Sequence, residues 1–240
     1  MKEIKILHLF PQLLSLYGEY ANVAMLAKTL RDAGCAVTVE GYENGPLDLS
    51  CDMVYVGAGT EDNLQEALKR LLPYAKDIAQ SVNDGTLWLA TGNAMTLFGK
   101  AVTRRQQTEQ GLGVFEYTTE IDDTQRFLGD VLTDDHFAGA QSIGFVNSSC
   151  IYKGIASPLL RFALGAKLGN DKISAADGIW EKNFYGTGLI GPLLVKNPHI
   201  LSHIFQALTG EPLQIPEDSY MKKAYGVSLA ELRALQAKEA

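Results

Sequence analysis

Continuous apolar runs and segments of helical periodicity alternate along the first hundred residues. Such runs are typical of strands buried on both faces, and strands that alternate with helices form parallel, doubly wound sheets. Gly34 and Gly85 stand where a C-terminal glycine would end each helical segment. The predicted strands are residues 4–10, 35–42, 52–59 and 86–92, and the predicted helices are residues 22–34 and 61–85. This half of the chain predicts an α/β fold with a mostly parallel sheet.

The second half alternates polar and apolar positions, which predicts antiparallel strands. The alternating segments are residues 113–121, 126–133 and 142–149, and residues 177–194 return to strand and loop. Residues 197–210 predict a helix, because Pro198 is well placed near a helix start. No repeat and no linker rich in Pro, Gly or Ser divides the chain. We therefore expect one domain over residues 1–212 and a helical tail of the same domain over residues 213–240.

Composition excludes several classes of protein. The chain has 240 residues, of which 46% are hydrophobic, and a formal net charge of −7. A nucleic-acid-binding protein needs a basic face, which this composition does not offer. The first ten residues lack the pattern of a signal peptide, and no apolar run is long enough to span a membrane, so we expect a cytoplasmic protein. Three widely spaced cysteines, Cys35, Cys51 and Cys150, predict neither a disulfide framework nor a zinc site, and we expect no metal and no cofactor.

The segment "GTLWLATGNAMTLFGK", residues 85–100, predicts a buried strand, a sharp turn and a helix. In α/β enzymes this turn often carries the nucleophile in a strained conformation. Here the turn carries Gly92, which adopts such a conformation at little cost but has no reactive group.

Five segments resemble the class I glutamine amidotransferases of the cobyric acid synthase (CobB/CobQ) type, and among them the stand-alone glutaminase subunits (GatD) of lipid II isoglutaminyl synthase. The resemblance runs from about residue 5 to about residue 208. It is strongest at the nucleophile turn and at "YGTGLIGPLLVKNP". The five segments are residues 13–34, 54–62, 89–100, 124–130 and 185–198.

The resemblance implies a three-layer, flavodoxin-like fold and a Mur-ligase-like partner. It also aligns the family's catalytic cysteine with Gly92 and its catalytic histidine with Ile190. The family's chemistry needs a thiolate that attacks the glutamine amide and an imidazole that activates it. Neither glycine nor isoleucine can transfer a proton, and losing a nucleophile or its base costs a serine protease about a millionfold in turnover. We therefore predict a pseudoenzyme that lacks glutaminase activity.

Several residues of the pocket are candidates for binding a ligand without cleaving it. The resemblance places Arg126 where the family engages the substrate glutamine, and arginine binds carboxylates in a bidentate manner. It also places the loop at 57–59 where backbone N–H groups would face an oxyanion. The complete set of ligand-binding candidates is Gly57, Ala58, Gly59, Asn93, Arg126, Asn147 and Ser148.

Other nucleophiles and histidines offer weaker hypotheses. Thr91 should point away from the turn, whereas Ser148, Ser149 and Cys150 are possible substitute nucleophiles without an evident base. His199 and His203 share a helix face, for which a surface pair is the more ordinary interpretation than a metal site. His8 and His136 have no partner in the sequence.

Three hypotheses of different classes remain. The first is a non-catalytic scaffold or regulator of a Mur-ligase-like amidating enzyme. The second is a sensor that binds glutamine or another amino acid. The third is an enzyme with a substitute nucleophile such as Cys150.

Overall fold

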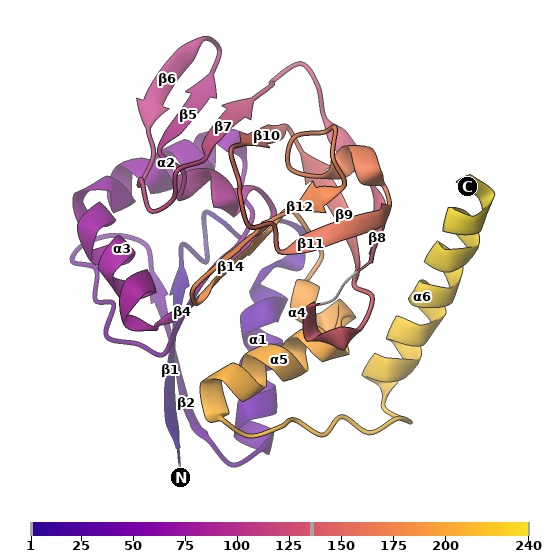
Figure 1. Cartoon of the computed structure of the whole chain (residues 1–240). Helices are drawn as coiled ribbons and strands as arrows, with labels where there is room; N and C mark the ends of the chain where they lie inside the picture. The colour runs from indigo at the N-terminus through magenta and orange to yellow at the C-terminus, as the bar shows by residue number, and fades with distance from the viewer. Residues whose placement is uncertain (1, 135–136, 240) are drawn as a thin grey trace.

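A six-stranded sheet forms the centre of the molecule, which is described by a computed structural model for residues 2–134 and 137–239 (Figure 1). Its strand order is β13-β14-β4-β3-β1-β2, and all neighbours pair in parallel except β13 with β14. The strands are β1 (Glu3–Leu9), β2 (Ala36–Tyr42), β3 (Met53–Val56), β4 (Leu87–Thr91), β13 (Ile179–Glu181) and β14 (Phe184–Thr187). The parallel sheet predicted from the apolar runs is confirmed.

Helices cover both faces of this sheet and produce three layers (Figure 1). Side chains of α1, α4 and α5 pack with alternate residues of β1, such as Ile4 and Ile6, in one core. Side chains of α2 and α3 pack with the intervening residues, such as Leu7 and Leu9, in a second core. The helices are α1 (Tyr20–Asp32), α2 (Glu61–Leu71), α3 (Ala75–Asp84), α4 (Leu193–Lys196) and α5 (Pro198–Thr209), with 3-10 turns at Leu16–Gly18, Leu72–Tyr74, Gly92–Leu97, Phe137–Gly139 and Ala166–Leu168.

Two four-stranded sheets are built mainly from the second half of the chain. One has the order β10-β7-β5-β6 and the other β12-β11-β8-β9; within them, only β5 and β7 pair in parallel. Their strands are β5 (Ala101–Arg104), β6 (Gln107–Gln110), β7 (Thr118–Ile121), β8 (Phe127–Thr133), β9 (Ile143–Ser148), β10 (Cys150–Lys153), β11 (Leu160–Leu164) and β12 (Ala176–Asp177). The antiparallel character expected of this half is confirmed.

Two predicted strands are shorter than expected. The strand predicted at 113–121 begins only at Thr118, because Val114 and Phe115 donate their backbone N–H groups to Phe98 O and form a loop. The apolar side chains of this loop contribute to the core instead, since Phe115 packs on Phe184. The strand predicted at 52–59 ends at Val56, and the following glycines form a loop.

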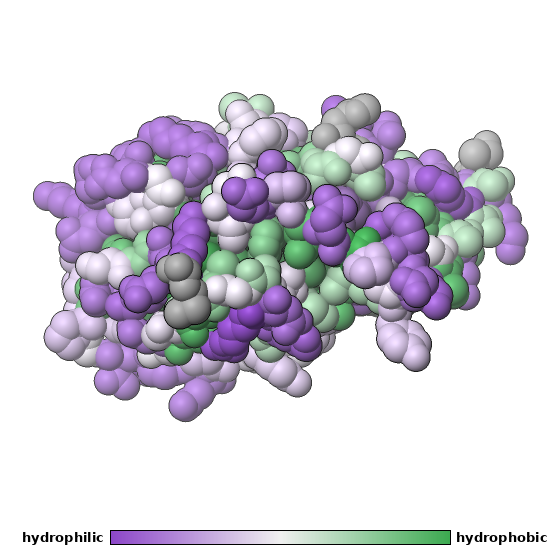
Figure 2. Space-filling view, turned by 90° about the horizontal axis from the view of Figure 1, so that it is seen from below, coloured by the Kyte–Doolittle hydropathy of each residue, from purple (hydrophilic) through white to green (hydrophobic). Residues whose placement is uncertain are grey.

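Helix α6 (Tyr220–Glu239) follows an extended segment that crosses the lower face of the molecule (Figure 1). Seen from below, this face shows hydrophobic residues between hydrophilic ones (Figure 2). Leu213 and Ile215 of the segment pack against the core that contains α1 and α5, while Leu232 of α6 packs on Leu132 and Ile143. Within the described ranges, no helix is both long and apolar enough to cross a membrane.

Candidate functional site

The turn after β4 lies in the middle of the parallel sheet, between the ends of β3 and β14. Thr91 ends β4, and Gly92 begins the 3-10 helix η3 (Gly92–Leu97) with a φ of 63°. Its backbone N–H donates to Leu189 O at 3.1 Å. An L-residue with a side chain adopts this left-handed conformation only at a cost, so glycine suits the backbone of the turn.

The space beside Gly92 is filled by two side chains. A Cβ atom added to Gly92 would lie 2.7 Å from Ile190 Cγ2 and 2.8 Å from Ala58 Cβ. Ile190 is 4% exposed and Ala58 is 2% exposed, and the Ile190 N–H donates to Phe145 O at 2.9 Å. The position that sequence analysis assigned to a nucleophile is therefore packed with apolar atoms, and Ala58 takes part in the packing as much as Ile190 does.

The Gly57–Gly59 loop is held against η3 by the side chain of Asn93. Asn93 Oδ1 accepts from the Gly59 N–H at 3.1 Å, and Asn93 Nδ2 donates to Gly59 O at 2.8 Å. A Cβ on Gly57 would lie 2.7 Å from Leu14 O, so this approach requires glycine. The structure thus brings Asn93 and the loop together as expected, but the Gly59 N–H already has an internal acceptor.

A fully buried carboxylate, Glu19, ties the turn to its neighbours. Glu19 is 0% exposed and accepts from Tyr55 Oη at 2.9 Å, from the Gly191 N–H at 2.9 Å and from Thr91 Oγ1. Burial raises the pKa of Glu19, against the opposing effect of these hydrogen bonds. Glu19 therefore joins the start of α1, the end of β4 and the segment after β14.

Asn22 extends this network into the helical layer. Its Nδ2 donates to Tyr55 Oη at 2.9 Å, and its Oδ1 accepts from the Leu194 N–H at 2.8 Å. Sequence reasoning missed both Glu19 and Asn22 as members of the site. The available signal was their place in "LYGEYAN", inside a segment that carries the family resemblance.

Arg126 lies in a cluster of polar side chains at the surface, beside Glu61 at the start of α2. It donates to Glu61 Oε1 at 2.9 Å and to Asn147 Oδ1 at 3.1 Å, and its side chain is 45% exposed. Ser149 Oγ also donates to Glu61, at 2.7 Å. Burial alone would raise the pKa of Glu61, but the bond from Ser149 and the charge of Arg126 together lower it. Two of the ligand-binding candidates, Arg126 and Asn147, are thus in contact, but the guanidinium already has a carboxylate partner in Glu61.

The proposed substitute nucleophiles are engaged in internal packing. Cys150 is 0% exposed, burial raises the pKa of its thiol, and Thr96 Oγ1 donates to its Sγ at 3.4 Å. Ser148 Oγ accepts from the Cys150 N–H at 3.0 Å. A reactive cysteine needs access and a stabilised thiolate, so this environment disfavours the hypothesis of an enzyme based on Cys150.

The expectation of a surface pair of histidines was wrong. His199 and His203 are both half-buried in α5, where His199 Nε2 bonds Ser142 Oγ at 2.9 Å and His203 Nε2 bonds Tyr185 Oη at 3.4 Å. Their i, i+4 spacing places both side chains on the face of α5 that contacts the neighbouring strands and loops. His136 lies outside the described residues, and within the described part of the chain no three His, Cys, Asp or Glu side chains converge as a metal site.

The three layers around a mostly parallel sheet are those of a class I glutamine amidotransferase fold. A solved glutamine amidotransferase superimposes with a TM-score of 0.54 at 14% identity, covering 85% of this chain and 99% of the other. PurLQS from Thermotoga maritima superimposes with a TM-score of 0.50 at 12% identity, covering 97% and 100%. The predicted fold class is therefore confirmed.

Residues 5–198 match the CobB/CobQ-like glutamine amidotransferase domain, and the chain belongs to this family. It is similar to the GatD subunit of lipid II isoglutaminyl synthase (glutamine-hydrolyzing) from Staphylococcus aureus (strain N315), with 27% identity over 209 residues, 86% of this chain and 84% of the relative. The GatD subunit from Streptococcus pneumoniae (strain ATCC BAA-255 / R6) is 25% identical over 224 residues, 89% and 85% of the two chains.

Proposed function

We propose that this chain is a GatD-like subunit without glutaminase chemistry that binds a Mur-ligase-like amidating enzyme in the cytoplasm and acts as its scaffold or regulator. The partner would take free ammonia, or a different nitrogen source, in place of ammonia released from glutamine. Similarity to two GatD subunits along most of the chain supports the choice of partner class.

The observation that carries the proposal is the packing around Gly92. Both Ile190 and Ala58 lie within 3 Å of the point where any side chain at position 92 would begin. A glutaminase needs room at this point for a thiolate and for the substrate amide. Apolar packing at this point supports the proposal that the former active-site pocket is closed, in addition to having lost its reactive groups.

The frame around the turn supports a structural role for this region. Glu19, Tyr55 and Thr91 remain fully buried and bonded to one another, so the ends of β3 and β4 keep a defined geometry. Breaking a buried network of this kind is strongly destabilising. A subunit that must present a fixed surface to a partner would need this frame even without catalysis.

A second candidate function is amino-acid sensing at Arg126. A cavity of about 320 Å³ lies beside Arg126 and is also lined by Thr124 and Ser149. A ligand carboxylate would have to compete with Glu61 for the guanidinium, which makes this the weaker proposal. It predicts saturable binding of glutamine that Arg126→Ala weakens, and it fails if glutamine does not shift the melting temperature of the chain.

The partner hypothesis is tested by co-expression with a Mur-ligase-like protein from the same cell. We expect the two chains to co-purify, and we expect the complex to amidate its substrate with ammonium but not with glutamine. Purification of the chain alone, with that protein present in the lysate, would contradict the partner hypothesis. Amidation driven by glutamine would contradict the proposal that this chain has lost glutaminase activity.

A further inference from the structure

A small cavity lies beneath the β5–β6 hairpin, and neither Gly92 nor Ile190 lines it. Its volume is about 130 Å³. Its floor is apolar and comes from α2, η3, β5 and β7, with each side chain at most 8% exposed. The floor residues are Leu64, Leu68, Leu97, Val102 and Ile121.

The hairpin is held over α2 by two polar contacts. Gln65 Nε2 donates to Glu109 Oε1 at 2.8 Å, and Arg104 Nη1 bonds Asp62 Oδ1 at 2.5 Å. The hairpin projects from the top of the molecule in Figure 1. The cavity therefore lies between an apolar helix face and a hairpin that side-chain contacts keep in place.

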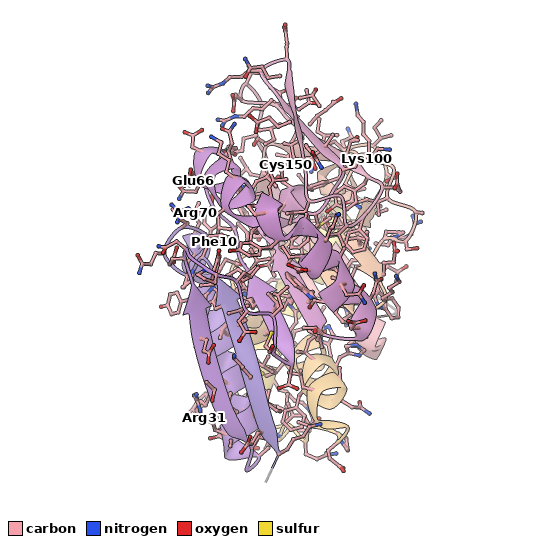
Figure 3. The ribbon with its side chains drawn as sticks, turned by 90° about the vertical axis from the view of Figure 1, so that its left-hand side faces the viewer. Phe10, Arg31, Glu66, Arg70, Lys100 and Cys150 are labelled. Atoms are coloured by element: carbon pink, nitrogen blue, oxygen red, sulfur yellow. The ribbon has the colours of Figure 1, made fainter. Side chains whose placement is uncertain are left out.

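The opposite face of α2 is polar and differs clearly from the cavity floor. Glu66 and Arg70 form an i, i+4 ion pair there, with Nε and Oε1 2.8 Å apart (Figure 3). Leu64 and Leu68 lie on the inner face of α2 and line the cavity.

The rim of the cavity carries charges of both signs. Arg104 is bonded on two sides, to Asp62 at 2.5 Å and to Asp123 at 2.9 Å. Arg105 bonds only one of these, Asp123, at 2.5 Å, and its side chain is 73% exposed. A guanidinium has five N–H donors, so Arg105 keeps donors for a ligand carboxylate. Asp62 is 83% exposed and offers acceptor positions to a ligand ammonium.

We propose that this cavity binds a free amino acid with a branched aliphatic side chain. An apolar cavity of 150 Å³ in another protein takes up one benzene molecule, so the apolar floor here fits a side chain of three or four carbons. The rim provides a cation for the α-carboxylate and acids for the α-ammonium, as a zwitterion requires. The proposal is independent of the partner, and although Glu61 and Arg105 also line the cavity beside Arg126, the apolar floor distinguishes the two sites by ligand class.

Isothermal titration calorimetry of the full chain tests the ligand class. Leucine, isoleucine or valine should bind saturably, whereas tryptophan is too large and glutamine too polar for the floor. Burial of an aliphatic side chain contributes about ten- to a hundredfold in affinity, so both controls should bind at least tenfold more weakly. 4-Methylpentanoate and 3-methylbutylamine each lack one charge of the leucine head group and should also bind more weakly.

Two substitutions and one control locate the site. Arg105→Gln changes an exposed side chain and should weaken leucine binding about tenfold, while Arg161→Gln, at an exposed arginine on β11, should leave it unchanged. Ile121→Phe should abolish binding by filling the cavity, with circular dichroism as the check on folding. The absence of saturable binding of all three branched amino acids would overturn the proposal, as would leucine binding that Arg105→Gln leaves unchanged.

Discussion

Substitution of Gly92 by alanine measures how tightly the former nucleophile position is packed. The new Cβ would require a left-handed backbone at φ 63° and would lie 2.7 Å from Ile190 Cγ2. The backbone term costs about 1–2 kcal/mol, and forcing an extra carbon into a packed core costs about 1–3 kcal/mol. Gly92→Ala should therefore lower the free energy of unfolding by about 2–5 kcal/mol.

Gly113 provides a matched control because its φ is almost the same but an added Cβ would have open space. Its φ is 65°, and a Cβ there would meet nothing within 4 Å. Gly113→Ala should cost only the backbone term of about 1–2 kcal/mol. The difference between the two variants isolates the contribution of packing around Gly92.

Urea unfolding followed by circular dichroism gives both values, provided that the slope with denaturant stays constant. Ala58→Gly should recover about 0.5–3 kcal/mol in the Gly92→Ala background, because it removes one of the two contacts. Equal costs for Gly92→Ala and Gly113→Ala would refute the reasoning that the turn is filled.

Three further substitutions test the surrounding network. Burial raises the pKa of Glu19 above its ordinary value of 4.5, so the carboxyl group binds its proton more tightly in the native state than in the unfolded state. The free energy of unfolding should therefore fall as pH rises from 4.5 through the native pKa. Glu19→Gln should remove this fall in urea unfolding measured across pH. Burial lowers the pKa of His8 from 6.5 to about 4, so stability should be lost as pH falls through that window, by up to about 3 kcal/mol, and His8→Leu should reduce this acid limb by about that amount. The part that remains should come from His199, whose pKa burial also lowers to about 4. Asn93→Ala leaves the Gly59 N–H without its acceptor and should cost about 1–3 kcal/mol of unfolding free energy, measured by urea unfolding beside the exposed control Asn44→Ala.

The central sheet could be predicted from the sequence because β1, β3 and β4 are each marked by a local run of apolar residues. In residues 4–9 and 87–91, every buried position except His8 and Thr91 is apolar, and each of these two strands is followed or preceded by a recognisable helix. The turn at Gly92 could also be predicted, since strand, glycine and helix follow one another directly. In contrast, Phe115 suggested a strand because an apolar side chain looks the same whether it packs from a strand or from a loop.

The contacts that define the site join residues far apart in the chain, which periodicity does not reveal. Glu19 is 172 residues from Gly191, whose N–H it accepts, and Arg126 is 65 residues from its partner Glu61. A carboxylate in a sequence is expected at the surface, so the burial of Glu19 depends on donors that only the folded chain assembles. The role of Ala58 in filling the turn likewise depends on the close approach of two loops.

Release of glutamate from glutamine tests the central claim most directly. The natural chain should show no release above the uncatalysed rate, with and without its partner. A variant that combines Gly92→Cys, Ile190→His and Ala58→Gly restores the reactive groups and removes the two side chains that obstruct them, so it should release glutamate measurably. Steady glutamate release by the natural chain would contradict the account, because a nucleophile other than residue 92 would then perform the reaction.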